Sequence, residues 1–337
     1  MSRFSNWKLS LQEREAAYLA EHTRANKAVR WARNPKHWKH WSWVIFRFLL
    51  ILSLSYIVLS PIFFMITMSI RLPWDNMDPS VVWVPRNFSF TVIQQTFKAM
   101  NFFPSLWNTL KISVFTGCLQ VVSTCIIGYG FARFKFPGRN LLFALVLFTL
   151  IVPFETIMPG LYLMFFNVGL KGTYFAFWLP AIFGSGIRAG IFVYIYRQFF
   201  RGQPPELAEA AVVDGCGYIK TFLKIMLPGA TSIVITIFLF ALVWQWNDNY
   251  LSAFFMDDVK YRTLATALSN LPEELRKLMA TNQDASGELG VSDANNQHTM
   301  MSIIQCGALV MIFPVLVIYI VLQRYFTESI SRSGIVG

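Results

Sequence analysis

The sequence predicts an all-α membrane protein with six transmembrane helices. Of the 337 residues 55% are hydrophobic and only 14% are charged, a balance that suits lipid better than water as the surrounding solvent. Apolar runs of about 20 residues, the length that crosses roughly 30 Å of hydrocarbon as a helix, also recur along the chain. The six predicted spans are residues 44–70, 108–132, 140–165, 174–200, 230–255 and 301–323.

A basic N-terminal extension, residues 1–42, precedes the membrane domain predicted for residues 43–337. The extension lacks the short apolar core and cleavage site of a signal peptide, so the first span is expected to stay in the mature protein. Its cations contribute much of the net charge of +11. Because basic residues beside a span orient it toward the cytoplasm, and no single basic groove or stacking module accompanies them, the sequence predicts contact with membrane lipid and no nucleic-acid partner.

The charges between the spans predict which connections are cytoplasmic, since cytoplasmic loops carry an excess of Lys and Arg. The connections after the second and fourth spans are basic, through Arg133, Lys135, Arg139, Arg197, Arg201, Lys220 and Lys224. The long connection 256–300 is richer in acidic residues and is predicted to lie outside. An even number of spans then places both termini, including the tail 324–337, in the cytoplasm.

The signatures of the commoner catalytic classes are missing from the sequence. It contains no G-x-x-x-x-G-K-[ST] phosphate loop, no H-E-x-x-H and no G-x-S-x-G, and its four cysteines form no closely spaced metal-binding pair. The run "GSGIRAG" has the glycines of a dinucleotide fingerprint, but it interrupts a predicted span, so Gly186 and Gly190 are predicted to allow close approach of a neighbouring helix. We therefore predict no catalytic residue, no cofactor and no metal site.

The polar segment 203–228, "QPPELAEAAVVDGCGYIKTFLKIMLP", separates the fourth and fifth spans. Pro204 and Pro205 predict the start of a short helix, because proline pre-sets the first turn. Glu206 and Glu209 then occupy that turn, where the helix dipole favours negative charge. Small side chains give this helix a nearly bare surface; they are Ala208, Ala210 and Ala211.

After a turn at Gly215 and Gly217, apolar positions recur at helical spacing in "YIKTFLKI", and Pro228 is predicted to close this second helix. The segment is thus predicted to be a helix, a turn and a helix on the cytoplasmic surface. Two uses remain open: an amphipathic loop lying on lipid headgroups, or a helix that docks into another protein. The bare alanines favour docking, because membrane anchoring favours bulky side chains.

The segment resembles the E-A-A loop of permease subunits in binding-protein-dependent ABC importers. The match consists of positions at fixed offsets: Glu209, Ala210, Ala211, Asp214, Gly215, Leu227 and Pro228. The stretches "WNTLKISV", "FARFKFPGRN", "WQWNDNYLSAFF" and "RYFTESISRSGIVG" are similar to the maltose-type second permease subunit of the carbohydrate-uptake class. The resemblance covers about residues 85–337, whereas the extension 1–42 and the polar stretch 282–297 depart from it.

The resemblance implies the type I ABC importer permease fold in a bacterial inner membrane. It implies three kinds of partner: a second permease, two ATPase subunits that hydrolyse ATP, and an extracytoplasmic sugar-binding protein. The helix 206–213 would be the coupling helix, with Glu206 and Glu209 at the ATPase. The tail would reach the ATPase interface through Ser331, Gly334 and Gly337, and the external loop would meet the binding protein.

Candidate pathway residues lie in three spans. Aromatic and amide side chains cluster late in the fifth span, at Trp244, Gln245, Trp246 and Asn247. They fit either a sugar pathway or an outer aromatic belt. Glu155 and Arg188 are ionisable residues inside the third and fourth spans, and they fit either a structural ion pair or a pathway role.

The sequence favours a sugar permease subunit but leaves other functions open. An importer of this type could instead carry peptides, polyamines or another solute. An ion-coupled secondary carrier would need no ATPase, but such carriers normally contain internal repeats and interrupted helices around intramembrane charges, and no repeat is visible. A membrane-embedded enzyme is disfavoured by the missing catalytic signatures.

Overall fold

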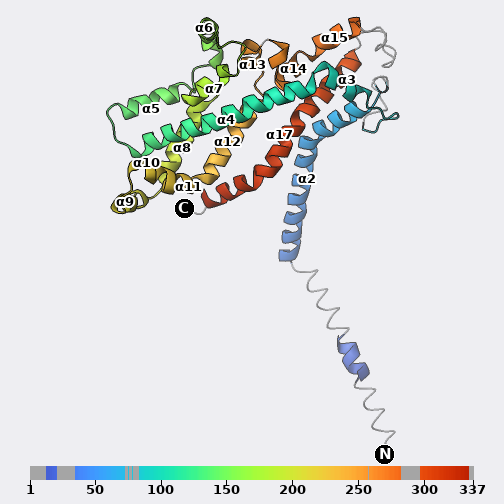
Figure 1. Ribbon diagram of the computed structural model, residues 1–337. Coiled ribbons are helices and arrows are strands. Elements are labelled where there is room, and N and C mark those ends of the chain that lie inside the picture. Colours follow the sequence, from blue (N-terminus) through green and yellow to red (C-terminus); the bar gives the residue numbers. More distant parts are fainter. Residues whose placement is uncertain are drawn as a thin grey trace, which may run out of the picture. The chain divides into compact units, whose positions relative to one another are not determined.

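The computed structural model describes residues 13–20, 35–72, 75, 78, 83–256, 258–281 and 297–333. This part of the chain is built of helices (Figure 1), with no strand beyond an isolated bridge between Arg71 and Phe88. The all-α prediction is confirmed. The chain divides into two compact units, residues 1–63 and 64–337.

Three predicted spans are long single helices. They are α2 (Pro35–Ile70), α4 (Phe102–Arg133) and α17 (Gln297–Ser333), and each contains an apolar stretch long enough to cross a bilayer. They contain the predicted spans 44–70, 108–132 and 301–323. Helix α2 passes through residue 43 without a break.

The other three predicted spans are each interrupted, so the prediction of continuous helices is wrong for them. The pairs are α5 (Arg139–Phe148) with α6 (Phe154–Asn167), α7 (Phe175–Ile182) with α8 (Ala189–Gly202), and α12 (Thr231–Trp246) with α13 (Tyr250–Phe255). Each break has a local cause. Pro153 precedes α6, Gly184 and Arg188 between α7 and α8 have positive φ, and Asp248 accepts hydrogen bonds from the first turn of α13. Hydropathy averages over such breaks and does not detect them.

Helix α4 is the centre of the larger unit and packs against α7, α8 and α12. Glycines permit its closest approaches. A Cβ at Gly128 would lie 2.5 Å from Cβ of Tyr196 on α8, and one at Gly117 would lie 3.4 Å from the ring of Phe238 on α12. Because the hydrophobic effect contributes little to helix association in lipid, van der Waals packing at such close backbone contacts stabilises the association of these helices.

Buried side chains form three core clusters. One joins α3 (Thr91–Ala99), α14 (Leu264–Ser269) and α15 (Leu271–Thr281) to α17. The second joins α4 to α8 and α12, and the third joins α4 to α6, α7 and α13. Helix α4 contributes to all three clusters and so connects the interrupted helices to one another.

The described part of the connection 256–300 folds back on α4. The side-chain amide of Asn108 donates to the carbonyls of Lys260 and Arg262, at 2.9 and 3.2 Å, and the Leu264 amide donates to the Thr109 hydroxyl at 2.8 Å. A short 3₁₀ turn (Val259–Tyr261) precedes α14. Residues 282–296 of the predicted insertion lie outside the described part.

Candidate functional site

The first helix of the predicted E-A-A segment is α9 (Glu206–Val213), with the bounds that the sequence predicts. Pro205 precedes it with φ −65°, and the carbonyl of Pro205 accepts hydrogen bonds from the amides of Ala208 and Glu209. Glu206 and Glu209 lie in its first turn, where their negative charges interact favourably with the positive end of the helix dipole. Local sequence chemistry therefore suffices to start this helix.

Gly215 ends α9 in a left-handed turn with φ +76°. The Cys216 amide donates to the Ala211 carbonyl at 2.9 Å, and the Gly215 amide donates to the Val212 carbonyl at 3.0 Å. This pair of bonds is the Schellman motif, which satisfies two terminal carbonyls and needs a residue at positive φ. No atom lies within 4 Å of a Cβ built at Gly215, so the glycine is required by backbone conformation rather than by space.

The second half of the segment is less regular than the sequence predicts. It runs through α10 (Tyr218–Thr221), a π-helical turn (Phe222–Met226) and α11 (Leu227–Gly229). It then bends by 78° into α12. Pro228 lies inside α11 rather than after it. π-Helical turns are rare and concentrate at functional positions.

The π-helical turn packs on the C-terminal end of α4. The ring of Phe222 lies 4.7 Å from that of Tyr129, and Thr221 and Met226 are buried. Tyr218, which the helical spacing places on the apolar face, is instead 72% exposed. Leu227 is half-buried. The turn thus fixes α9 to the helices that cross the membrane domain.

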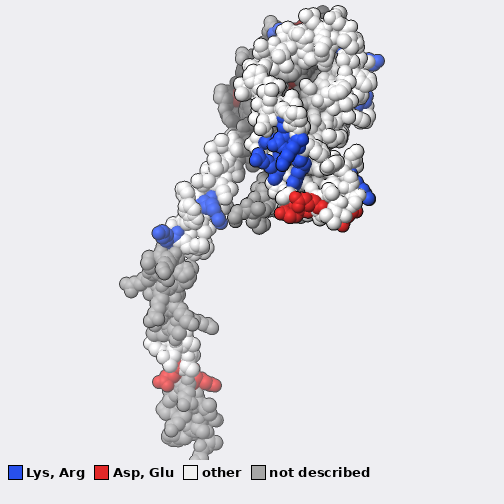
Figure 2. All heavy atoms as spheres, turned by 90° about the vertical axis from the view of Figure 1, so that its left-hand side faces the viewer, with Lys and Arg blue, Asp and Glu red and all other residues white. Residues whose placement is uncertain are grey.

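The surface of α9 is acidic and apolar rather than bare. Ala211 is buried against the neighbouring turn and Ala208 is half-buried, so Ala210 is the alanine left exposed. The other exposed side chains of α9 are Glu206, Leu207, Glu209, Val212 and Val213, and Asp214 follows them. Figure 2 shows acidic side chains gathered at this end of the molecule, below a group of basic ones. Such a surface could dock on a partner that offers a basic rim and an apolar groove.

The predicted C-terminal contacts fall largely outside the described part. Ser331 lies in the last turns of α17, and Gly334 and Gly337 are beyond it.

A second candidate site lies where the helix breaks converge. Glu155, Arg188 and Asp248, one from each break region, line one cavity of about 530 Å³. No salt bridge joins Glu155 to Arg188 in the described part of the chain. Instead, the Arg188 guanidinium lies 4.8 Å from the centre of the Trp244 ring. Of the two alternatives left open by the sequence, an ion pair is therefore not seen, although the two residues share a cavity.

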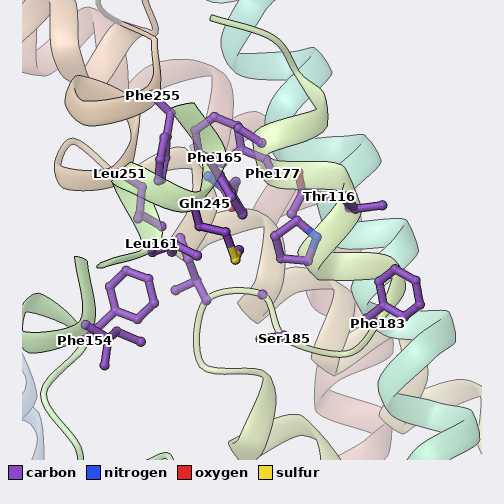
Figure 3. Close-up of a pocket in the computed structure, with 17 residues that line it drawn as sticks. Thr116, Phe154, Leu161, Phe165, Phe177, Phe183, Ser185, Gln245, Leu251 and Phe255 are labelled. Atoms are coloured by element: carbon purple, nitrogen blue, oxygen red, sulfur yellow. The ribbon is translucent and has the colours of Figure 1, made fainter. Parts of the chain in front are cut away.

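A neighbouring cavity of about 310 Å³ has apolar walls, both aliphatic and aromatic, and a polar floor (Figure 3). Gln245 and Thr116 line it, with exposed fractions of 4% and 2%. The Gln245 amide nitrogen and the Thr116 hydroxyl are buried there without a hydrogen-bond partner. Aliphatic side chains, such as Leu161 and Leu251, share the walls with five phenylalanines: Phe154, Phe165, Phe177, Phe183 and Phe255. A ligand with an apolar face and hydroxyl groups would complement both the walls and the floor.

The other three candidates of the fifth span point elsewhere. Trp246 is buried in a core, and its indole donates to the Met311 carbonyl on α17 at 3.1 Å. Asn247 is exposed and donates to the Val243 carbonyl. Trp244 stacks on Phe192 in addition to contacting Arg188. The structure thus brings Gln245, among these four, to the 310 Å³ cavity.

Two residues that the sequence analysis missed hold the break between α7 and α8. The Gln120 side-chain amide donates to the Ile187 carbonyl at 2.7 Å, and the Ser123 hydroxyl donates to the Ala181 carbonyl at 2.6 Å. A Cβ at Gly186 would lie 3.0 Å from the Gln120 side chain, and one at Gly190 would lie 3.0 Å from the Val146 carbonyl of α5. The predicted close approach at both glycines is confirmed. The available signal was a polar stripe along α4 at helical spacing, formed by Ser113, Thr116, Gln120, Ser123 and Thr124.

Comparison with known proteins identifies one family. The family model described as binding-protein-dependent transport system inner membrane component matches residues 124–332. The melibiose/raffinose/stachyose import permease protein MelC of Bacillus subtilis is 28% identical over 280 residues, which cover 82% of this chain and 91% of MelC. The arabinooligosaccharides transport system permease protein AraQ of Halalkalibacterium halodurans is 30% identical over 230 residues, which cover 68% of this chain and 73% of AraQ.

A solved structure shares the fold. A chain in the crystal structure of a bacterial ABC transporter involved in the import of the acidic polysaccharide alginate superimposes with a TM-score of 0.67. The match covers 84% of this chain and 96% of that one, at 20% sequence identity.

Proposed function

Since this chain belongs to the family of binding-protein-dependent transport system inner membrane components, we propose that it is one of two permeases in an ATP-driven sugar importer. Members of this family are transport subunits rather than enzymes, and ATP hydrolysis is assigned to separate subunits. Six crossings of the bacterial inner membrane, with both termini in the cytoplasm, agree with the charge distribution. Three of those crossings would be made by the interrupted pairs α5–α6, α7–α8 and α12–α13.

Helix α9 is proposed to be the coupling helix that docks on an ATPase subunit. Its exposed Glu206 and Glu209, flanked by exposed Leu207 and Val213, supply charge and apolar contact together. Glu209 would pair with a basic residue of the ATPase. The Schellman turn at Gly215 and the π-helical turn join α9 to α4 and α12, so movement of the ATPases would reach the membrane domain through packed elements. The tail after α17 would reach the same ATPase interface.

The proposed cargo is a sugar or oligosaccharide. Two observations support this class: the saccharides in the names of MelC and AraQ, and the phenylalanines and polar floor of the 310 Å³ cavity. Gln245 and Thr116 would donate or accept hydrogen bonds with sugar hydroxyls. The external loop 256–300 would meet the extracytoplasmic binding protein that delivers the sugar.

The α9 surface is the observation that carries the proposal, and charge reversal tests it. Glu209→Lys should abolish uptake and reduce copurification of the ATPase, whereas Glu13→Lys, a change at an exposed carboxylate of the N-terminal extension, should leave both unchanged. Both variants would be assayed in proteoliposomes holding the whole importer. Normal uptake and assembly with Glu209→Lys would remove the coupling role.

A different solute is the second candidate. The E-A-A segment does not discriminate among cargoes, so ligand screening of the purified binding protein against sugars, peptides and polyamines decides between them. Binding of a peptide or polyamine but of no sugar would reassign the cargo.

An ion-coupled carrier also receives some support, because the helix breaks surround the ionisable residues Glu155, Arg188 and Asp248. Uptake that follows an ion gradient in proteoliposomes without ATP would favour it over the importer.

A further inference from the structure

Three arginines gather where α5 begins and α8 ends. Arg139 and Phe143 lie four residues apart on α5, and Arg197 and Arg201 lie four apart on α8, so each pair shares a helix face. The two helices pack together, and the Arg197 guanidinium lies 4.0 Å from the centre of the Phe143 ring. Arg139, Arg197 and Arg201 are called the arginine cluster below.

The positive charge of the arginine cluster is not neutralised within the described part of the chain. No salt bridge there involves any of the three arginines. The charged groups that act on Arg197 include Arg201 and Arg139, both of its own sign. Its Nε is buried without a hydrogen-bond partner. Like charges held this close repel one another, and an anion with several acceptor oxygens would relieve the repulsion.

An exposed apolar surface continues from the arginine cluster along α5. None of the residues of α5 is buried, and four of its large apolar side chains are exposed by 47–67%: Leu141, Leu142, Leu145 and Phe148. The helix begins after Gly138 without a side-chain cap, so its first amides add positive potential beside Arg139. Cations and apolar surface therefore adjoin on one pair of helices.

We propose that the arginine cluster binds the phosphate of an anionic phospholipid, with the acyl chains along the exposed face of α5. A phospholipid has both an anionic, oxygen-rich headgroup, which would face the arginine cluster, and apolar acyl chains, which would face α5. The acidic surface of a protein would satisfy the arginines but would leave the leucines of α5 uncovered. The site lies close to the basic connection 133–139, which is predicted to be cytoplasmic, so the lipid would come from the inner leaflet.

Native mass spectrometry of the full chain in mild detergent tests the proposal. The protein is titrated with phosphatidylglycerol, phosphatidylcholine or inorganic phosphate. At about 1 kcal/mol for each arginine near an anionic headgroup, one phosphatidylglycerol should bind about a hundredfold more tightly than phosphatidylcholine. The triple variant R139Q/R197Q/R201Q should lose this preference.

A charge-matched control separates the site from general attraction. The variant K98Q/K220Q/K224Q removes three exposed cations elsewhere and should keep the preference. Helical circular dichroism of both variants shows whether they fold. Equal loss in both variants, or retention of phosphatidylglycerol by the arginine variant, overturns the site.

Two further outcomes also overturn it. If inorganic phosphate binds the wild type as tightly as phosphatidylglycerol, the site takes a free anion and α5 has no part. If the arginine variant keeps its lipid but no longer copurifies with its ATPase, the arginines hold a protein surface.

Discussion

The E-A-A segment and the break between α7 and α8 are both irregular, but they are held in different ways. In the E-A-A segment the conformation follows from residues close in sequence: Pro205 begins α9 and Gly215 ends it. In the break, Arg188 adopts φ +54° without being a glycine, which costs about 1–2 kcal/mol. Bonds from Gln120 and Ser123 of α4 hold that segment. One region is therefore specified locally, and the other exists because α4 lies beside it.

The largest effect is expected where α4 meets α8, because the break depends on this scaffold. Gly128→Leu places side-chain atoms against the backbone of Val193 and Arg197, so it should destabilise the protein by about 1–3 kcal/mol or more. Thermal unfolding in detergent measures the change. Gly130→Leu is the matched control, since no atom lies within 4 Å of a Cβ there. Equal losses in the two variants would contradict the scaffold role of α4.

A smaller effect is expected from removing one bond of the break. Gln120→Leu leaves the carbonyl of the half-buried Ile187 without its donor, at a cost of about 1–1.5 kcal/mol. Hydrogen exchange of residues 183–191 should accelerate while that of α9 stays unchanged. Gln94→Leu, an exposed change on α3, should alter neither region. Faster exchange at α9 would show that the two regions are not independent.

Hydrogen exchange in the E-A-A segment should change when the glycine of its Schellman turn, Gly215, is replaced. Gly215→Ala imposes about 1 kcal/mol of strain at positive φ, so hydrogen exchange of residues 206–216 should rise about fivefold. Gly215→Asn should cause less, because asparagine tolerates this conformation. Gly217→Ala is the control: Gly217 has φ −71° and open space around it. An equal response at Gly217 would mean that general flexibility, not the Schellman turn, matters.

The smallest effect on stability is expected at the floor of the 310 Å³ cavity. Gln245→Leu removes a buried amide that has an unpartnered nitrogen, so the free energy of unfolding should change by less than about 1 kcal/mol. Sugar uptake should fall because a hydrogen-bonding group is lost. Asn247→Leu, two residues further along and outside the cavity lining, should retain uptake. Unchanged uptake with Gln245→Leu would remove this residue from the pathway.

Neighbouring residues show how far sequence reasoning could go. The four residues 244–247 share one interpretation in the sequence, as aromatic and amide side chains of a pathway or a belt. The helix separates them: Trp244 contacts Arg188, Gln245 lines a cavity, Trp246 is buried in a core and Asn247 is exposed. Likewise, the sequence left Glu155 and Arg188 as either an ion pair or pathway residues, and they share a cavity without forming an ion pair. Rotation about a helix and the position of its neighbours decide these outcomes, and an apolar run carries little information on either.

The sequence by itself determined the helical class, the three long helices, the bounds of α9 and the membership of the permease family. These features rest on hydropathy, proline, glycine and fixed motif offsets, which act within a few residues. Only the tertiary structure decided that the other three spans are broken, and which polar groups of α4 hold one of those breaks. An arginine at positive φ and a buried amide are stable only when packed neighbours compensate them. Those neighbours lie far away in sequence, as Gln120 and Ile187 do at a separation of 67 residues.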